Sequence, residues 1–265
     1  MIILKLGGSV ITKKGAKEPT IDYDNLNRIS AEIASSSFDK LIIVHGAGSY
    51  GHPFAKEYEI GSPIKDEEDL ANKKIGFCIT QSWVKKLNTI VCDSLRENGV
   101  LSVSIQPSSF IITKNKRIYS CDLNLINKYL EMGFVPVIYG DVVVDLDESI
   151  KICVLSGDQI IRYFGENLKP ERVILGSDVD GIYTKDPKKY EDAELMSTVT
   201  SCEDLVTEGS LNVDVTGGMN GKLLELIELA ELEVESEIIN ASKEGLIKKA
   251  LNHQKGIGTV IKKMK

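Results

Sequence analysis

The chain has 265 residues, a length typical of one large domain or of two closely joined ones. Hydrophobic residues make up 42% of it and charged residues 27%, a composition that allows a substantial core and excludes intrinsic disorder. With 39 acidic and 32 basic residues, the net charge is −7. This charge disfavours nucleic acid or an anionic membrane as a partner but is compatible with a local basic site. No apolar stretch is long enough to predict a membrane-spanning helix.

The usual signs of export and of a zinc site are also missing. The first residues, Met1–Leu6, run directly into Gly7-Gly8 without the basic and apolar regions of a secretion signal, so we expect a cytoplasmic protein. The cysteines are widely spaced and form no Cys-x-x-Cys motif, which indicates reduced packing residues and no metal site of the protein's own. They are Cys78, Cys92, Cys121, Cys153 and Cys202.

Apolar runs alternate with helical periods along the first half of the chain, which predicts β-α-β units. The first unit is a strand at 2–6, a helix over 26–33 and a strand at 41–44. The elements expected after it are a helix around 83–95, a strand near 101–105, a helix near 123–130, a strand at 135–139 and a hairpin over 142–155.

The second half repeats the alternation. The expected elements are a helix near 158–168, a strand at 173–175, an irregular stretch from 177 to about 201, a helix near 220–232, a strand at 237–240, a helix near 244–251 and a strand near 259–261. Short runs of β-branched residues suit a mostly parallel sheet covered on both faces. We predict one α/β domain over residues 1–265, with lobes 1–168 and 169–265 that meet near Pro170.

Glycine-rich segments follow strand-like runs at two places and precede a helix at a third. They are Gly7-Gly8, the segment 46–51 and Gly217-Gly218. In open α/β sheets ligands bind beyond the carboxyl ends of the strands, where glycine lets backbone N–H groups approach phosphate oxygens. The three segments together predict a phosphate-rich ligand or two ligands, although each alone is equally consistent with a tight turn.

Two common phosphate-binding motifs can be tested against these segments. Residues 46–51 match G-x-G-x-x-G, but the dinucleotide-binding fold also needs an acidic residue about 20 positions later at a strand end. Residues 66–69 are acidic but lie in a charged stretch without a strand pattern. The Walker A motif has no match, because Leu223 follows Gly221-Lys222. Neither motif describes this chain.

Lysines lie beside the glycine segments. Lys5 interrupts an apolar strand, where an unpaired ammonium group is costly to bury, so it needs an anionic partner. Lys13-Lys14 follows the first glycine pair, and Lys222 lies in the first turn of the helix predicted after the third. Such lysines can stabilise a phosphoryl group during transfer without a protein nucleophile. Lys13 and Lys14 are also consistent with solvated surface residues.

Three further positions are candidates for binding or catalysis. His52 ends the second glycine segment, where an imidazole can hold a phosphate or a carboxylate. The acidic segment 178–181 follows a strand and suits either orientation of lysines and nucleotide-bound Mg²⁺ or a simple Asx turn. Residues 156–158 begin a helix and can form an N-cap or an anion-binding helix terminus.

Taken together, these motifs resemble the amino acid kinase superfamily, collinearly over essentially the whole chain. The shared segments are Lys5–Ser9, Gly46–Gly48, Ser156–Asp158, Asp178–Thr184 and Thr216–Lys222. Within the superfamily, the segments His45–Pro53, Gln106–Ser109 and Tyr139–Val142 resemble the archaeal-type isopentenyl phosphate kinases. The Gly-His-Pro ending at His52 is the most specific element, because relatives that phosphorylate amino acids lack this histidine.

The resemblance implies an open αβα sandwich that forms a homodimer and transfers the γ-phosphoryl group of ATP, with Mg²⁺ bound through its phosphates, to isopentenyl phosphate. Lobe 1–168 would bind the acceptor and form the dimer, and lobe 169–265 would bind the nucleotide. The implied catalytic residues are Lys14, His52, Lys5 and Lys222. The implied ATP-binding residues are Lys5, Gly7, Gly8, Ser9, Gly48, Asp178, Tyr183, Gly217, Gly218 and Lys222. The implied acceptor-binding residues are Ala47, Gly48, His52 and Gly157.

A prenyl tail also needs an apolar pocket, and the segment before and within the helix around 83–95 offers candidates. Ile75, Phe77, Ile79 and Trp83 can line such a pocket or simply pack the helix. Two other functions stay open: a kinase of the superfamily with a carboxylate, carbamate or nucleoside monophosphate acceptor, and a nucleotide-binding regulator without catalytic activity.

Overall fold

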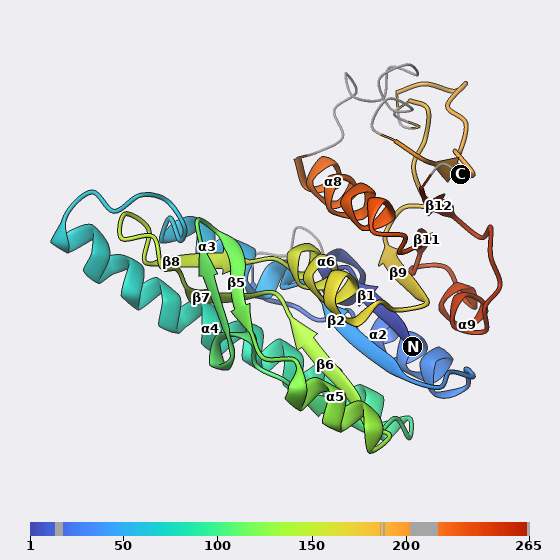
Figure 1. Cartoon of the computed structure of the whole chain (residues 1–265), viewed down its shortest axis with the longest axis horizontal. Helices are drawn as coiled ribbons and strands as arrows, with labels where there is room; N and C mark the ends of the chain where they lie inside the picture. The colour runs from blue at the N-terminus through green and yellow to red at the C-terminus, as the bar shows by residue number, and fades with distance from the viewer. Residues whose placement is uncertain (14–17, 186, 188, 202–216, 264–265) are drawn as a thin grey trace.

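The computed structural model describes residues 1–13, 18–185, 187, 189–201 and 217–263, with the backbone alone for 217–220 and 222. An eight-stranded sheet runs through the centre of the molecule (Figure 1). All its neighbouring strands pair in parallel except β11 and β12. In sheet order the strands are β10 (Thr198–Val199), β12 (Thr259–Ile261), β11 (Ser236–Asn240), β9 (Arg172–Ser177), β1 (Ile2–Leu6), β2 (Leu41–His45), β6 (Val135–Tyr139) and β3 (Ser102–Ser104).

Helices cover both faces of this sheet, which confirms the predicted αβα sandwich. The helices α1 (Gly8–Ile11), α2 (Tyr23–Ala34), α4 (Glu67–Glu97) and α9 (Leu246–Leu251) contribute their apolar side chains to the core on one face. The helices α5 (Asn124–Glu131), α6 (Gly157–Leu168) and α8 (Gly217–Glu231) contribute theirs on the other. Among the described residues, no helix is both long and apolar enough to span a membrane.

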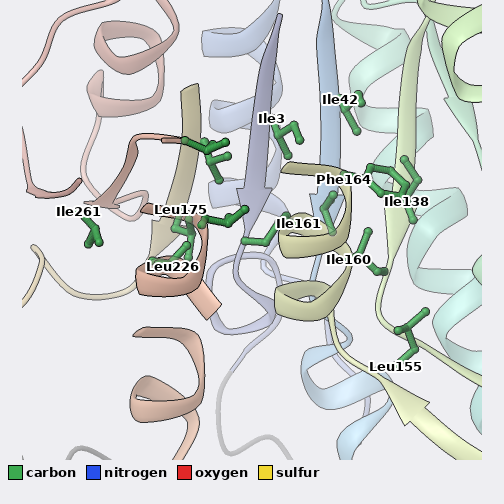
Figure 2. Close-up of a cluster of buried hydrophobic side chains, with 14 of the residues drawn as sticks. Ile3, Ile42, Ile138, Leu155, Ile160, Ile161, Phe164, Leu175, Leu226 and Ile261 are labelled. Carbon is green, nitrogen blue, oxygen red and sulfur yellow. The ribbon is translucent and has the colours of Figure 1, made fainter. Parts of the chain in front are cut away.

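The strands are apolar throughout because both of their faces are buried. In β1, Ile3 packs into the α6 and α8 face, as Figure 2 shows, whereas Ile2 and Leu4 pack on the opposite face. Since successive side chains of a strand alternate in direction, Lys5 shares the face of Ile3. The strand therefore directs Lys5 toward α6.

The structure extends α4 well beyond its predicted start. The helix begins after Asp66, whose side chain accepts a hydrogen bond from the backbone N–H of Asp69 at 2.8 Å. The acidic residues 67–69 lie in the first turn, where negative charge is favourable. Lys73 is buried one turn further on and pairs with Asp69 at 2.6 Å. The charged stretch is thus the capped beginning of a 31-residue helix.

The sequence prediction also missed a hairpin formed by β4 (Ile111–Lys114) and β5 (Arg117–Cys121). Its turn residues Asn115 and Lys116 both have positive φ, at 51° and 63°. Turns of this type usually contain glycine, and this one does not. The carboxylate of Asp145 stabilises the turn by accepting from both backbone N–H groups, at 3.0 and 2.7 Å. The predicted hairpin of β7 (Asp141–Val144) and β8 (Ile152–Leu155) is confirmed.

The described cysteines are free thiols, in agreement with the prediction. Burial raises the pKa of Cys92 and Cys121 to about 12 and that of Cys153 to about 11, so these thiols are unreactive. Cys202 lies outside the described residues. Within the described part of the chain, no three His, Cys, Asp or Glu side chains cluster in a way that would hold a metal ion.

Candidate active site

The predicted site residues of the first lobe gather where β1, β2 and β6 end. Strand β1 leads into α1, and β2 leads through Gly46 and Ala47 into a short 3₁₀ helix, η1 (Gly48–Tyr50), and then α3 (His52–Glu57). Helix α6 begins beside these loops with Gly157. Parallel strands end at one edge of a sheet, and this edge carries the ligands of open α/β folds.

The glycines of the first two loops let the two backbones touch. A Cβ atom at Gly8 would lie 2.6 Å from the Cα of Gly48, and one at Gly46 would lie 2.6 Å from the N of Gly8. Gly48 also has a positive φ of 50°. These glycines are thus required by the packing of loop against loop, a reason that the sequence does not reveal. Phosphate binding by Gly7, Gly8 and Gly48 stays a prediction.

Hydrogen bonds fasten the same loops to each other and to β9. The Thr12 hydroxyl donates to the carbonyl of Gly8 at 2.8 Å and accepts from the backbone N–H of Ser49 at 3.2 Å. The backbone N–H of Gly7 donates to the carbonyl of Gly176 at 2.8 Å. Ser9 lies within the short α1 helix between these contacts. The loops form one rigid unit at the end of three neighbouring strands.

Lys5 has the anionic partner that its buried position requires. Its side chain is directed to α6, and its ammonium group pairs with the carboxylate of Asp158. The residue is only 4% exposed. Asp158 belongs to the first turn of α6, whose N-cap, Ser156, accepts from the backbone N–H of Gln159 at 3.1 Å. Segment 156–158 therefore both caps the helix and holds the lysine.

Lys5, Ala47 and Gly157 converge on one place. A Cβ atom at Gly157 would lie 3.3 Å from Cε of Lys5. One at Gly140, directly after β6, would lie 3.6 Å from the N of Gly157 and 3.7 Å from the N of Ala47. The first N–H groups of a helix have no intrahelical acceptor, so the N-terminus of the 12-residue helix α6 offers N–H groups beside an ammonium group. This combination suits a phosphate.

His52 is the exposed first residue of α3, next to this loop unit. The preceding Gly51 packs against the loop, since a Cβ atom there would lie 2.5 Å from that of Ala47 and 2.9 Å from Cγ1 of Val84 in α4. The histidine is therefore anchored close to Ala47 by a glycine that tolerates no side chain.

The predicted tail-pocket residues lie on α4, beside α3. Trp83 is half-buried, stacks on Phe54 with ring centroids 5.6 Å apart and meets Tyr50 edge-on at 5.8 Å. Phe77 packs against a small apolar cluster of Ile60, Val142 and Ile152. Ile79 is half-buried, whereas Ile75 is exposed. Three of the four candidates thus lie on the partly covered side of α4.

The nucleotide-side candidates form a separate group beyond β9 and β11. Asp178 is exposed directly after β9. The Tyr183 hydroxyl donates to Asp180 at 3.2 Å, and Asp180 also accepts from Asn240 at 2.9 Å and pairs with Lys243 at 2.6 Å. These contacts lower the pKa of Asp180, the hydrogen bond from Lys243 most of all. Asp180 is therefore ionised and orients both the tyrosine and a lysine.

Lys14 lies outside the described residues, and so does the side chain of Lys222. Gly217 and Gly218 begin α8 instead of preceding it, so Lys222 lies in the second turn, not the first.

Three residues of this region were not predicted as site residues. Asp158 was part of the predicted helix start and of the family resemblance but was not predicted as the partner of Lys5, although the need of Lys5 for an anion was a usable signal. Gly140 is part of the Tyr-Gly-Asp-Val motif on which the family resemblance rests, but no role was predicted for it. Thr12 gave no signal, because its contact with Ser49, which is 37 positions away, forms only through the fold.

The fold and this edge of the sheet match a known class of phosphotransferases. The model of the amino acid kinase family matches residues 1–240. The chain belongs to the amino acid kinase family.

Isopentenyl phosphate kinases are among the proteins to which this chain is similar. An isopentenyl phosphate kinase from Methanothermobacter thermautotrophicus is 58% identical over 98% of both chains. A solved structure of isopentenyl phosphate kinase superposes with a TM-score of 0.91 at 54% identity, over 98% of this chain and 99% of the other. The T. acidophilum isopentenyl phosphate kinase in its product complex gives a TM-score of 0.79 at 30% identity, over 99% and 100%. This similarity confirms the resemblance to isopentenyl phosphate kinases that the Gly-His-Pro motif indicates.

Proposed function

We propose that this chain transfers the γ-phosphoryl group of ATP to the phosphate of isopentenyl phosphate, which gives isopentenyl diphosphate and ADP. The observation that carries the proposal is the similarity to isopentenyl phosphate kinases over nearly the whole chain. The convergence of Lys5, Ala47 and Gly157 supports it, since a cation and N–H donors meet where an acceptor phosphate would have to lie.

Phosphoryl transfer depends on positioning and on positive charge near the moving oxygens, and no protein nucleophile is needed. Asp158 holds the ammonium group of Lys5 at the N-terminus of α6. The ammonium group is therefore already in position before phosphates bind. Lys14 would stabilise the transferring group, and Lys222 would bind ATP phosphates with Lys5, Gly7, Gly8, Ser9 and Gly48. Gly217 and Gly218 would approach the same phosphates at the start of α8.

ATP supplies the phosphoryl group, and Mg²⁺ would be held through its phosphates. The side chains beside the strand ends fit this arrangement, because Lys5 and helix N–H groups suit phosphate oxygens and do not coordinate a cation. Asp178 and Tyr183 would face the nucleotide beyond β9, where Asp180 fixes the tyrosine hydroxyl.

His52 would hold the acceptor phosphate together with the backbone of Ala47, Gly48 and Gly157. Its place at the start of α3 sets the imidazole one residue from the anchored Gly51. Phe77, Ile79 and Trp83 would line the tail pocket from α4. The stacking of Trp83 on Phe54 also gives the tryptophan a packing role, so its variants need a fold control.

We infer a cytoplasmic homodimer formed through lobe 1–168, with lobe 169–265 binding the nucleotide. Light scattering coupled to gel filtration measures the dimer directly, and a monomer at micromolar concentration would contradict it.

The experiment that tests the function measures ADP formation from Mg²⁺-ATP with six acceptors: isopentenyl phosphate, dimethylallyl phosphate, N-acetylglutamate, glutamate, carbamate and UMP. Isopentenyl phosphate should be phosphorylated far faster than any carboxylate. Turnover of N-acetylglutamate or UMP without turnover of isopentenyl phosphate would favour another acceptor class, and absence of turnover with every acceptor would favour a non-catalytic nucleotide-binding regulator.

A further inference from the structure

A fully buried imidazole lies directly beneath the loop that would hold the acceptor phosphate. His45 is the last residue of β2 and is 0% exposed. It precedes Gly46 and Ala47. It therefore lies two residues before the backbone N–H group of Ala47, which is proposed to bind the acceptor phosphate. The proposed chemistry makes no use of this histidine.

Both ring nitrogens of His45 have defined partners. Nδ1 lies 3.0 Å from the carbonyl oxygen of Gly46, which can only accept, so Nδ1 carries the proton. Nε2 lies 3.1 Å from Nδ2 of Asn88 in α4, which donates to it. The Asn88 amide is oriented independently, because Nδ2 also faces the carbonyl of Val137 at 3.4 Å and Oδ1 accepts from the Ser104 hydroxyl. The hydrogen bonds at Nδ1 and at Nε2 both require the neutral tautomer that carries its proton on Nδ1.

Burial keeps the imidazole neutral. Desolvation lowers the pKa of His45 to about 4, against a smaller opposing effect of the hydrogen bond to Gly46. The ring also stacks on Tyr139 with centroids 5.5 Å apart and an interplanar angle of 15°. The imidazole is therefore fixed in position and in protonation at neutral pH.

The hydrogen bond from His45 fixes a peptide plane. The carbonyl of Gly46 and the N–H of Ala47 belong to one trans peptide unit, in which they point in opposite directions. Since His45 holds the carbonyl on the α4 side of the sheet, the Ala47 N–H points to the α6 side. The N of Gly157 and the side chain of Lys5 lie on that side, and Gly140 leaves space between the two backbone nitrogens.

We propose that His45 is a positioning residue for acceptor binding: it donates Nδ1–H to the Gly46 carbonyl and thereby aims the Ala47 N–H at the acceptor phosphate. The inference rests on the proposed function, because it takes the Ala47 N–H as a phosphate donor. Asn88 selects the tautomer that makes the donation possible.

The test compares two substitutions at His45. His45→Phe keeps a ring that can stack on Tyr139 but loses both hydrogen bonds, whereas His45→Asn keeps an N–H donor near the position of Nδ1. A small misplacement of a binding group can cost up to about 100-fold in rate, so His45→Phe should lower kcat/KM for isopentenyl phosphate by about 10-fold to 100-fold. The KM for ATP should stay within about twofold, and His45→Asn should recover part of the loss.

Tyr139→Phe is the matched control. The Tyr139 hydroxyl is buried and makes no hydrogen bond with the described residues, so its removal should leave both KM values within about twofold. A folded His45→Phe enzyme with wild-type kcat/KM for the acceptor would overturn the inference. Equal rises of both KM values without recovery in His45→Asn would also overturn it, because they would indicate a general structural role.

A spectroscopic measurement keeps the inference testable if His45→Phe does not fold. Long-range ¹H–¹⁵N correlation on the wild-type protein should show His45 as the neutral Nδ1–H tautomer at pH 7. The Nε2–H tautomer or a charged ring would contradict it. If the wild-type enzyme phosphorylates an acceptor other than isopentenyl phosphate, the proposed function fails, and the His45 variants are then measured with that acceptor.

Discussion

The loop after β2 and the segment after β9 both lie at the carboxyl edge of the sheet, but they are held in opposite ways. The loop after β2 is fixed by backbone contacts between Gly8 and Gly48 and by the buried, neutral His45. The segment after β9 is fixed by the charge of Asp180, which binds Asn240 and the exposed Lys243. The loop after β2 is thus held by close packing and an uncharged ring, whereas the segment after β9 is held by charged groups that are open to water.

This difference corresponds to the two proposed ligands. An acceptor phosphate must be placed accurately against the γ-phosphate, which favours a support that cannot relax. A nucleotide has a larger surface and can be held by solvated groups, whose individual contributions are small. Substitutions in the first region should therefore reduce catalysis strongly, and those in the second should reduce mainly nucleotide affinity.

The largest effect is expected at Lys5, whose buried ammonium group would lie close to the phosphates of both ligands under the proposed function. Lys5→Met removes a buried cation and should lower kcat/KM on the order of 10³-fold, comparable to the loss of a preorganised charge-stabilising donor. It should also lower the melting temperature, since Asp158 loses its partner.

The matched control for this prediction is the double variant Lys5→Met with Asp158→Asn. Neutralising the orphaned carboxylate should restore part of the melting temperature while activity stays low. Recovery of activity in the double variant would show that Lys5 acts only through the stability of α6.

The next effect is expected at Gly8. In Gly8→Ala the new Cβ would lie 2.6 Å from the Cα of Gly48, so the two loops must separate. We expect kcat/KM to fall about 100-fold for both substrates, with a loss of stability of about 1–3 kcal/mol from overpacking. The measurements are steady-state kinetics and urea unfolding.

Gly221 in α8 provides the comparison for Gly8, because a Cβ atom there would meet no atom of the described residues within 4 Å. Gly221→Ala should increase the free energy of unfolding by about 0.5–1 kcal/mol, as expected for glycine replacement inside a helix. Wild-type stability in Gly8→Ala would contradict the rigid contact between the two loops.

A loss confined to the acceptor is expected at His52. His52→Ala should reduce kcat/KM for isopentenyl phosphate by about 100-fold, because a contact that orients the acceptor and offsets phosphate repulsion is lost. The affinity for ATP should be nearly unchanged, and His52→Gln, which keeps one donor, should fall between the two. A folded His52→Ala enzyme with near-wild-type kcat/KM between pH 6 and 9 would assign the histidine a structural role.

The smallest effect is expected at Asp180. Asp180→Asn removes an ion pair with the exposed Lys243 and should change the stability only slightly, because water screens such pairs. Since the pKa of Asp180 is lowered in the folded protein, the wild-type contribution is present above the usual carboxyl pKa and is lost as the pH falls through the lowered pKa. The KM for ATP should rise a few-fold, and the KM for the acceptor should not change; the reverse pattern would place Asp180 on the acceptor side.

The sequence predicted those features that depend on local pattern. The alternation of apolar runs and helical periods gave the layered α/β fold, and the isolated charge of Lys5 in an apolar strand indicated a buried ion pair. It did not identify Asp158 as the partner, because the two residues are 153 positions apart and meet only through the order of the strands.

Features that depend on tertiary contact were not predicted. The hairpin of β4 and β5 was not predicted, because its Asn115-Lys116 turn is stabilised from outside by Asp145. The close contact of the two loops at glycines 8, 46 and 48 was not predicted, and the predicted approach of these glycines to phosphate stays a prediction. His45 is part of the segment 45–53 that carries the family resemblance, but no role was predicted for it, since its hydrogen bonds to a carbonyl and to an amide from α4 form only in the fold.

The central claim is that the rigid loop after β2 presents the phosphate of isopentenyl phosphate to ATP. It is tested most directly by ³¹P NMR of the wild-type enzyme with Mg²⁺-ATP and isopentenyl phosphate. The account predicts paired resonances of a diphosphate monoester that grow in equal amount with ADP, while inorganic phosphate stays at the level of a control without enzyme. Release of inorganic phosphate without a new diphosphate, or an unchanged spectrum, would contradict it.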